Sequence, residues 1–445
     1  MKLWDKGTPL NAIIEQFTVG KDRELDLSLA RWDILGSLAH ITMLESIGLM
    51  EKEELRVLKK ELIRILKEVV GQGKFTIEEG VEDVHSQIEM MLTAALGDAG
   101  KKIHSGRSRN DQVLVDLKLF FRHEIRELAG LTTTLFETLT QLSEKHREVL
   151  MPGYTHMQVA MPSSFGLWFG AYAESLSDDL HLLQAAYKIS NQNPLGSAAG
   201  YGSSFPLNRT LTTNLLGFED LSYNVVYAQM GRGKTERSLA FALASLAGTL
   251  GKFAMDICLY NGQNFNFFRF PKELTTGSSI MPHKANPDVF ELLRARCNRL
   301  QALPNTIGMI TGNLPAGYHR DLQLIKEEIL PAIDEMKACL EVFNFSIRQI
   351  EVNDDILREE KYDYLFTVEE VNEWVLKGVP FREAYRKVGE KIAAGNYHPE
   401  RKIAHQHEGS IGHLCTEEIK NKFYSVISNM HFSKVDEALG ALIEE

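Results

Sequence analysis

The sequence has few cysteines and no excess of positive charge, and each shortage excludes a class of protein. Among its 445 residues are four cysteines, which are far apart and form no CxxC pair: Cys258, Cys297, Cys339 and Cys415. We therefore expect reduced thiols in an apolar interior rather than a disulfide framework. The formal net charge is -11. Neither nucleic acid nor an anionic membrane is an expected partner, because both require a basic surface.

Long apolar segments without charge are also scarce. Residues 239–251 are uncharged but shorter than the ~20 residues that cross a bilayer, and residues 149–173 are interrupted by Pro152, Gly153 and Pro162. The first ten residues mix charges with apolar side chains and lack the apolar core of a secretory signal. The sequence therefore predicts a soluble cytoplasmic protein that spans no membrane.

The spacing of apolar residues predicts an all-α fold. Only 13 prolines occur, and apolar residues recur every three or four positions, as in the helical face formed by Leu55, Leu58, Leu62, Leu66 and Val69. Four longer segments of this kind predict an extended central helix bundle: residues 114–150, 163–191, 236–259 and 288–311. Residues 239–251 are apolar nearly all round, so we expect them at the centre of a bundle that other subunits complete.

Helix boundary signals near the C-terminus predict a separate small domain. Thr367 begins a Thr-Val-Glu-Glu run typical of a capping box, and Gly378 followed by Pro380 is typical of a helix stop. We predict an N-terminal helical domain over residues 1–110, a central helix-bundle domain over 111–360 and a C-terminal helical domain over 361–445.

The loop over residues 277–287, which reads GSSIMPHKANP, contains the groups needed to hold an anion. Gly277 permits a close approach of backbone amides to a ligand, and the prolines stiffen the loop so that Lys284 projects from a defined point. This string resembles the signature of the fumarase and aspartase superfamily, whose enzymes release fumarate from a succinyl group by breaking a C–N or C–O bond. A serine-rich surface turn is the alternative.

Elimination of fumarate places negative charge on the substrate, and the loop is suited to stabilise it. Removing a carbon-bound proton beside a carboxylate creates a dianionic aci-carboxylate, which requires nearby cations and N–H donors. Lys284 supplies a cation and Asn286 a donor amide. The resemblance implies that Ser278 is the catalytic base, its alkoxide stabilised by this charge when the loop closes.

A basic segment over residues 101–112 precedes a predicted helix and is suited to bind carboxylates. Arg109 can form a bidentate pair with a carboxylate, and Ser108 and Asn110 can donate beside it. A basic loop paired with surface acids is the alternative. The run over residues 106–112 resembles the argininosuccinate lyases almost residue for residue, which favours substrate binding.

A histidine after a Pro-Gly turn is the candidate proton donor. The departing nitrogen needs a proton, which histidine can hold near neutral pH, although a lone histidine is more often structural. The resemblance implies that His156, paired with Glu291, performs this proton transfer and that Thr155 contacts a substrate carboxylate.

Further segments extend the resemblance over nearly the whole chain in the same order. His85 lies in an acidic segment similar to one in the family, with a buried structural histidine as the alternative, and Tyr318, Gln323 and Lys326 match residues that hold the amino-acid half of argininosuccinate. The resemblance implies a homotetramer whose active sites each combine three subunits. We expect no metal and no organic cofactor, since no cluster with metal-ligand spacing occurs.

Departures from the family pattern lie mostly in segments expected near the amino-acid half. Argininosuccinate lyases usually have Gln and Lys where this chain has His283 and Ala285, an Asp-Arg-Asp element where it reads GRGK over residues 231–234, and a serine where it has Asp22. We hypothesise an altered leaving group, such as an argininosuccinate whose α-amino group is acylated, with Lys234 as an added cation.

The predicted function is that of an argininosuccinate lyase, a carbon–nitrogen lyase that releases fumarate and arginine from a small-molecule substrate in arginine biosynthesis. His283 is also typical of adenylosuccinate lyases, which are one alternative. A non-catalytic, crystallin-like homologue is another, but such a protein is free to lose Ser278 and His156, and both are present.

Overall fold

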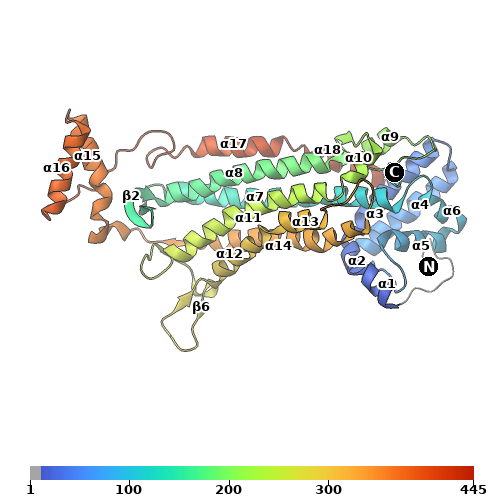
Figure 1. The fold of residues 1–445 in the computed structure, drawn as a ribbon, viewed down its shortest axis with the longest axis horizontal. Helices are drawn as coiled ribbons and strands as arrows, with labels where there is room; N and C mark the ends of the chain where they lie inside the picture. Colours follow the sequence, from blue (N-terminus) through green and yellow to red (C-terminus); the bar gives the residue numbers. More distant parts are fainter. Residues whose placement is uncertain (1–11, 445) are drawn as a thin grey trace.

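The computed structural model describes residues 12–444, and these are mostly helical, as predicted. A group of short helices forms one end of the elongated molecule (Figure 1). It consists of α1 (Ala12–Val19), α2 (Asp22–Leu25), the 3₁₀-helix η1 (Asp26–Leu29), α3 (Ala30–Ser46), α4 (Lys52–Arg64), the π-helical turn η2 (Ile65–Val70), α5 (Val84–Leu96), α6 (Asp98–Lys101) and η3 (Lys102–His104).

Helices that run side by side, the longest of which is α7, form the body of the molecule (Figure 1). They are α7 (Arg109–Lys145), α8 (Phe165–Ser190), α11 (Lys234–Tyr260), α12 (Asp288–Leu300), α13 (Leu303–Ile310) and α14 (Ile325–Ile347). Shorter elements, α9 (Arg209–Leu215) and α10 (Val225–Met230), connect α8 to α11. The apolar faces of these helices share one core with the N-terminal helices, so burial of the periodic apolar residues explains the bundle.

Helix α11 contains the apolar segment predicted to lie at the centre of the bundle. Leu239, Leu243, Leu246 and Leu250 are buried against neighbouring helices, chiefly α8 and α12, whereas Phe241 is 52% exposed. Among residues 12–444, α11 is the one helix long and apolar enough to cross a membrane. Of its most apolar 18-residue stretch, 56% is buried inside the protein. It therefore packs as a core helix with one uncovered apolar edge.

Two small β-hairpins project from the helical body. Strands β1 (Leu150–Thr155) and β2 (Gln158–Ser164) pair antiparallel at one end of the bundle, and β6 (Thr276–Gly277) and β7 (Ala285–Asn286) pair at the base of a protruding loop (Figure 1). Two further pairs join β3 (Gln192–Asn193) to β4 (Asp220–Leu221) and β5 (Phe268–Arg269) to β8 (Glu351–Val352).

The C-terminal region divides between two places. Helices α15 (Thr367–Leu376) and α16 (Phe381–Ala393) share a small core at the hairpin end, whereas α17 (Thr416–Ser428) returns along α8 and α18 (Phe432–Glu444) reaches α3 (Figure 1). The boundaries proposed at residues 110 and 360 stay predictions.

Of the two helix-boundary signals predicted near α15, one is confirmed and one is wrong. The helix stop is confirmed, since Gly378 has φ 89° and its N–H donates to the Val375 carbonyl. The capping box is wrong: the Thr367 hydroxyl donates instead to the Tyr364 carbonyl at 2.9 Å. All four cysteines are free thiols, as predicted, but only Cys297 and Cys339 are buried, whereas Cys258 and Cys415 are half-buried.

Candidate active site

A cavity at the end of the bundle where α7 and α14 begin collects six of the predicted substrate-binding residues. It has a volume of about 180 Å³. The six residues that line it come from α5, α7, the segment before α14, and α14 itself: His85, Arg109, Asn110, Tyr318, Gln323 and Lys326. Residues far apart in sequence therefore meet at one place.

The first turn of α7 presents Arg109 and Asn110 to this cavity. Ser108 is the N-cap: its hydroxyl accepts the Asn110 N–H at 3.3 Å, and its own N–H donates to Asp111 at 2.8 Å. The other oxygen of Asp111 accepts the N–H groups of Gly196 and Ala198, both at 2.9 Å. These bonds fix the helix start, so the side chains beside it have defined positions.

Arg109 is paired with acids inside the cavity. Its Nη1 lies 3.2 Å from both Glu82 and Asp83, and its Nη2 donates to the Ser86 hydroxyl at 2.6 Å. This agrees with the alternative of a basic loop paired with acids, although Glu82 and Asp83 are largely buried rather than on the surface. A substrate carboxylate would have to share or displace these contacts.

Lys326 lies between two carboxylates. Its Nζ is 2.6 Å from Asp26 and 2.7 Å from Asp22, and the side chain is only 5% exposed. Burial alone would lower the pKa of Lys326, but the two carboxylates outweigh burial and raise it. Burial raises the pKa of Asp22 to about 6, against the attraction of Lys326. The cation is thus held charged, and Asp22, one of the departures from the family pattern, contacts it directly.

Gln323 and Arg320 connect the cavity to the end of α1. The Gln323 amide donates to the carbonyls of Thr18 and Val19, both at 3.0 Å. Arg320 donates to the Thr18 carbonyl at 2.8 Å and to Glu82 at 2.9 Å. Part of the hydrogen-bonding capacity expected for substrate is therefore used within the chain.

His85 is both buried and part of the cavity wall, which joins the two alternatives given for it. It is 8% exposed, and its Nδ1 lies 2.5 Å from Asp33 and 3.5 Å from Asp116. Burial would lower the pKa of His85, but the Asp33 carboxylate outweighs it, and the pKa is raised. Sequence reasoning predicted no metal-binding spacing, yet Asp33, His85 and Asp116 bring three potential ligand atoms within 4.8 Å of one another.

The departure at residues 231–234 forms the turn into α11. Gly233 has φ 81°, and a Cβ there would lie 2.5 Å from the Thr311 methyl carbon, so glycine is required in this packing. Arg232 lines the cavity and pairs with Glu236 at 2.8 Å. Lys234 instead lines a neighbouring cavity.

Thr155 and His156 lie at the opposite end of the bundle. Thr155 is the last residue of β1, and His156 lies in the exposed turn between β1 and β2, where it has φ 53°. Helix α7, which begins at the cavity and ends near this hairpin, has 37 residues and therefore spans about 55 Å at 1.5 Å per residue. In one chain His156 cannot reach the cavity.

The predicted catalytic loop forms a third, separate group. Ser278, Lys284 and Asn286 lie on the protruding hairpin loop of β6 and β7 (Figure 1), and Lys284 is exposed. The Ser278 hydroxyl accepts the Met281 N–H at 3.1 Å, and Asn286 donates to Thr276 at 3.5 Å. Glu291 is exposed in the first turn of α12, and among residues 12–444 no hydrogen bond joins it to His156.

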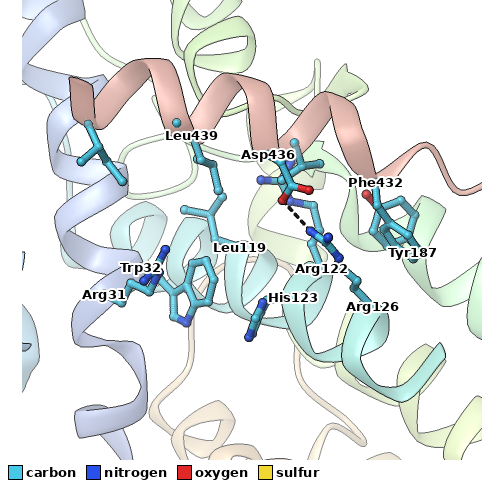
Figure 2. Close-up of a pocket in the computed structure, with 13 residues that line it drawn as sticks. Arg31, Trp32, Leu119, Arg122, His123, Arg126, Tyr187, Phe432, Asp436 and Leu439 are labelled. Atoms are coloured by element: carbon cyan, nitrogen blue, oxygen red, sulfur yellow. Dashed lines mark hydrogen bonds and ion pairs between the residues drawn. The ribbon is translucent and has the colours of Figure 1, made fainter. Parts of the chain in front are cut away.

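Another cavity contains none of the predicted site residues. This space has a volume of about 240 Å³. It lies beneath α18, and Figure 2 shows Trp32, Arg122 and Arg126 on its walls. Arg126 pairs with Asp436 at 2.5 Å, and Arg122 lies over the Phe218 ring at 4.1 Å. Because this space contains none of the residues that the motifs single out, the candidate active site remains the cavity around Lys326.

Sequence reasoning gave no binding role to several residues of this cavity. Asp26, Glu82, Asp83 and Arg320 line it besides the predicted ones, as do Asp22 and Arg232, which the sequence marked as departures expected near the amino-acid half. Each stands within or beside a segment discussed above, but a motif does not show which of its charged side chains turn inward.

Comparison with known proteins agrees with the resemblance seen in the sequence. Residues 8–302 match a protein family described as Lyase. The chain is 62% identical to an argininosuccinate lyase of Parabacteroides distasonis and 61% identical to one of Bacteroides thetaiotaomicron, each over 99% of both chains. An argininosuccinate lyase of Thermotoga neapolitana is 40% identical over 88% of this chain and 98% of its own.

Similar solved structures support the fold. An EDDS lyase in complex with formate has a TM-score of 0.77 at 21% identity and covers 98% of this chain and 95% of its own. A fumarate lyase:delta crystallin from Brucella melitensis bound to cobalt has a TM-score of 0.70 at 16% identity and covers 94% of this chain and 91% of its own. At such identities the likeness concerns the all-α architecture alone.

The family match over residues 8–302, together with the relatives above, defines a lyase of the fumarase/aspartase superfamily. Full-length identity at this level goes further: the chain belongs to the argininosuccinate lyase family and is a carbon–nitrogen lyase. Neither the adenylosuccinate-type alternative nor the non-catalytic one is favoured.

Proposed function

We propose that the protein eliminates fumarate from argininosuccinate and leaves arginine, as a cytoplasmic enzyme of arginine biosynthesis. The observation that carries this proposal is the 62% identity to an argininosuccinate lyase over 99% of both chains. A direct test is the rise in ultraviolet absorbance from fumarate when argininosuccinate is added to the purified protein. No rise, with the protein folded and at its native oligomeric state, would reject the proposal.

The proposed roles follow the charge that the reaction creates. Ser278 removes the carbon-bound proton, while Lys284 and Asn286 stabilise the aci-carboxylate. His156 with Glu291 supplies the proton to the leaving nitrogen. The fumarate half is held by Ser108, Arg109, Asn110 and Thr155, and the amino-acid half by Tyr318, Gln323 and Lys326. His85 is a further substrate-binding residue.

The separation of these groups in one chain supports a shared active site. The cavity, the His156 turn and the Ser278 loop lie at three places on an elongated body (Figure 1). Large apolar side chains are also exposed along the bundle: Phe241, Leu292, Met309, Val342 and Phe345. Such a surface is typical of an oligomer interface. We therefore propose a homotetramer in which each active site combines residues of three subunits. Light scattering coupled to size-exclusion chromatography measures the mass of the assembly.

An argininosuccinate with an acylated α-amino group is a second candidate substrate. A cavity next to the one around Lys326 favours it. This second cavity, of about 250 Å³, shares Arg232 with the cavity around Lys326 and is also lined by Lys234, Arg237 and His319, with no carboxylate among its lining residues. A group on the α-amino nitrogen could extend into it, and its cations suit an acyl group that ends in a carboxylate.

The comparison of three substrates tests the acylated form. We expect kcat/KM for argininosuccinate bearing an acyl group with a terminal carboxylate to exceed those for the plain and the acetylated compounds. Replacing Lys234 by methionine and Arg237 by glutamine should lower only the first of these values. A clear preference for plain argininosuccinate would reject this candidate and leave the lyase assignment intact.

A further inference from the structure

Asp33, His85 and Asp116 form a buried cluster behind the wall of the candidate active site. They come from α3, the first turn of α5 and the second turn of α7, so the cluster joins three helices. His85 Nδ1 lies 2.5 Å from Asp33 Oδ2 and 3.5 Å from Asp116 Oδ2. The two aspartates are 1% and 0% exposed. The proposed chemistry uses His85 but gives neither aspartate a role.

The two carboxylates have unequal partners. Asp33 Oδ2 accepts the Gln112 amide at 2.7 Å in addition to His85. Among residues 12–444, Asp33 Oδ1 and both oxygens of Asp116 are buried without a hydrogen-bond partner. Two ionised carboxylates facing each other away from water repel strongly, and unpartnered buried oxygens are costly. One proton between the carboxylates would remove the repulsion and satisfy an oxygen of each.

A proton suits this cluster better than a metal ion. The Nδ1 atom of His85 is already hydrogen-bonded to Asp33, and the buried guanidinium of Arg107 adds positive charge next to both aspartates. Arg107 itself donates to the Ser37 hydroxyl at 3.0 Å. The other charged or titratable groups that act on the cluster are Asp26 from η1, Asp83 and Glu89 at α5, His104 from η3, and Asp111 from α7.

We propose that Asp116 is a protonated carboxylic acid that donates to Asp33, and that this singly charged pair positions His85 as an imidazolium in the wall of the substrate cavity. Asp116 and Asp33 are thus positioning residues for a cation that binds substrate. The effect on substrate binding rests on the proposed function, whereas the protonation of Asp116 does not. Burial, aided by the charge of Asp33, raises the pKa of Asp116 well above its ordinary value.

Infrared difference spectroscopy tests the proton directly. The wild type at neutral pH should show the C=O stretching band of a protonated carboxylic acid, and Asp116→Asn should lack it. The matched control is Asp179→Asn, which replaces another buried aspartate outside the cluster and should leave the Asp116 band in place. Absence of the band in the wild type, or a divalent ion that copurifies with the wild type and is lost in Asp116→Asn, would overturn the proposal.

Steady-state kinetics test the positioning role. Asp33→Asn removes the charge that keeps His85 protonated, so KM for argininosuccinate at pH 7.5 should rise on the order of tenfold, the worth of one hydrogen bond to a charged group, and its pH dependence should move to lower pH. Asp116→Asn keeps the charge of the cluster and should raise KM less than about threefold. A shift in pH dependence as large as that of Asp33→Asn would show that Asp116 is ionised.

A third cluster variant separates the two parts of the proposal, the protonation of Asp116 and the positioning of His85. His85→Asn leaves the aspartate pair in place, so it provides the kinetic comparison if Asp33→Asn fails to fold. Its KM should rise about as much as that of Asp33→Asn, while the infrared band persists. A KM equal to that of the wild type, with the band present, would overturn the positioning of a substrate-binding cation and leave the proton assignment standing.

Discussion

Replacing Asp22 by asparagine tests the electrostatics of the cavity around Lys326. Burial raises the pKa of Asp22 from 3.8 to about 6 in the folded protein. Because the folded-state pKa lies above the unfolded value, the stability contributed by this group is fully present below pH 3.8 and is lost as the pH rises through about 6. A difference of about two pKa units corresponds to about 3 kcal/mol.

The Asp22→Asn side chain cannot ionise, so the variant should not lose stability as the pH rises through about 6. Between about pH 4 and pH 8, the free energy of unfolding of Asp22→Asn should gain about 3 kcal/mol relative to the wild type. Lys326 keeps its contact with Asp26 at 2.6 Å, so loss of the other contact adds an offset that varies little with pH. Urea unfolding at about pH 4, 6 and 8 measures the difference.

A surface variant provides the control for this experiment. Asp334, whose side chain is 76% exposed, pairs with Lys337 at 3.1 Å, and Asp334→Asn should follow the pH dependence of the wild type. If Asp22→Asn also followed the wild type at every pH, the raised pKa and the burial argument behind it would be refuted.

Three further predictions address the chemistry and the bundle. Ser278→Ala should lower kcat by about 10²–10⁴-fold without loss of fold, as expected for one positioned base, and near-normal turnover would remove Ser278 from the mechanism. Leu243→Ala, at a fully buried position of α11, should reduce the free energy of unfolding by about 2–5 kcal/mol, and a change below about 0.5 kcal/mol would contradict its place in the core. Dialysis against a chelator should leave kcat unchanged, since the proposed charge stabilisation uses Lys284 and donor groups; recovery of a lost activity by added metal would show otherwise.

The helices were predictable because burial of one face requires a three-to-four-residue repeat, which is local information. The patterns over residues 114–150, 163–191 and 236–259 correspond to α7, α8 and α11 within about five residues, whereas the pattern over 288–311 contains two helices, α12 and α13. The prediction of a capping box at Thr367 was wrong because the Thr367 hydroxyl donates to the Tyr364 carbonyl in the preceding turn. Local signals thus predicted where helices form better than how their ends are bonded.

The candidate site was predictable only as a set of residues. Motifs identified Arg109 and Lys326, but the residues that they contact are distant in sequence. Lys326 contacts Asp26, 300 positions away, and Arg109 contacts Glu82, 27 positions away. The cluster at His85 was missed for the same reason, since Asp33 is 52 positions away in sequence. Spacing along the chain does not encode such contacts when they join different helices.

Subunit mixing tests most directly whether each active site combines groups from different chains. Ser278→Ala and Lys326→Met each disable one of the separated groups, so hybrid tetramers assembled from the two variants should contain some sites with both groups intact. The account predicts that hybrids release fumarate much faster than either variant alone. Hybrids no more active than their parents, at the same tetrameric mass, would contradict it.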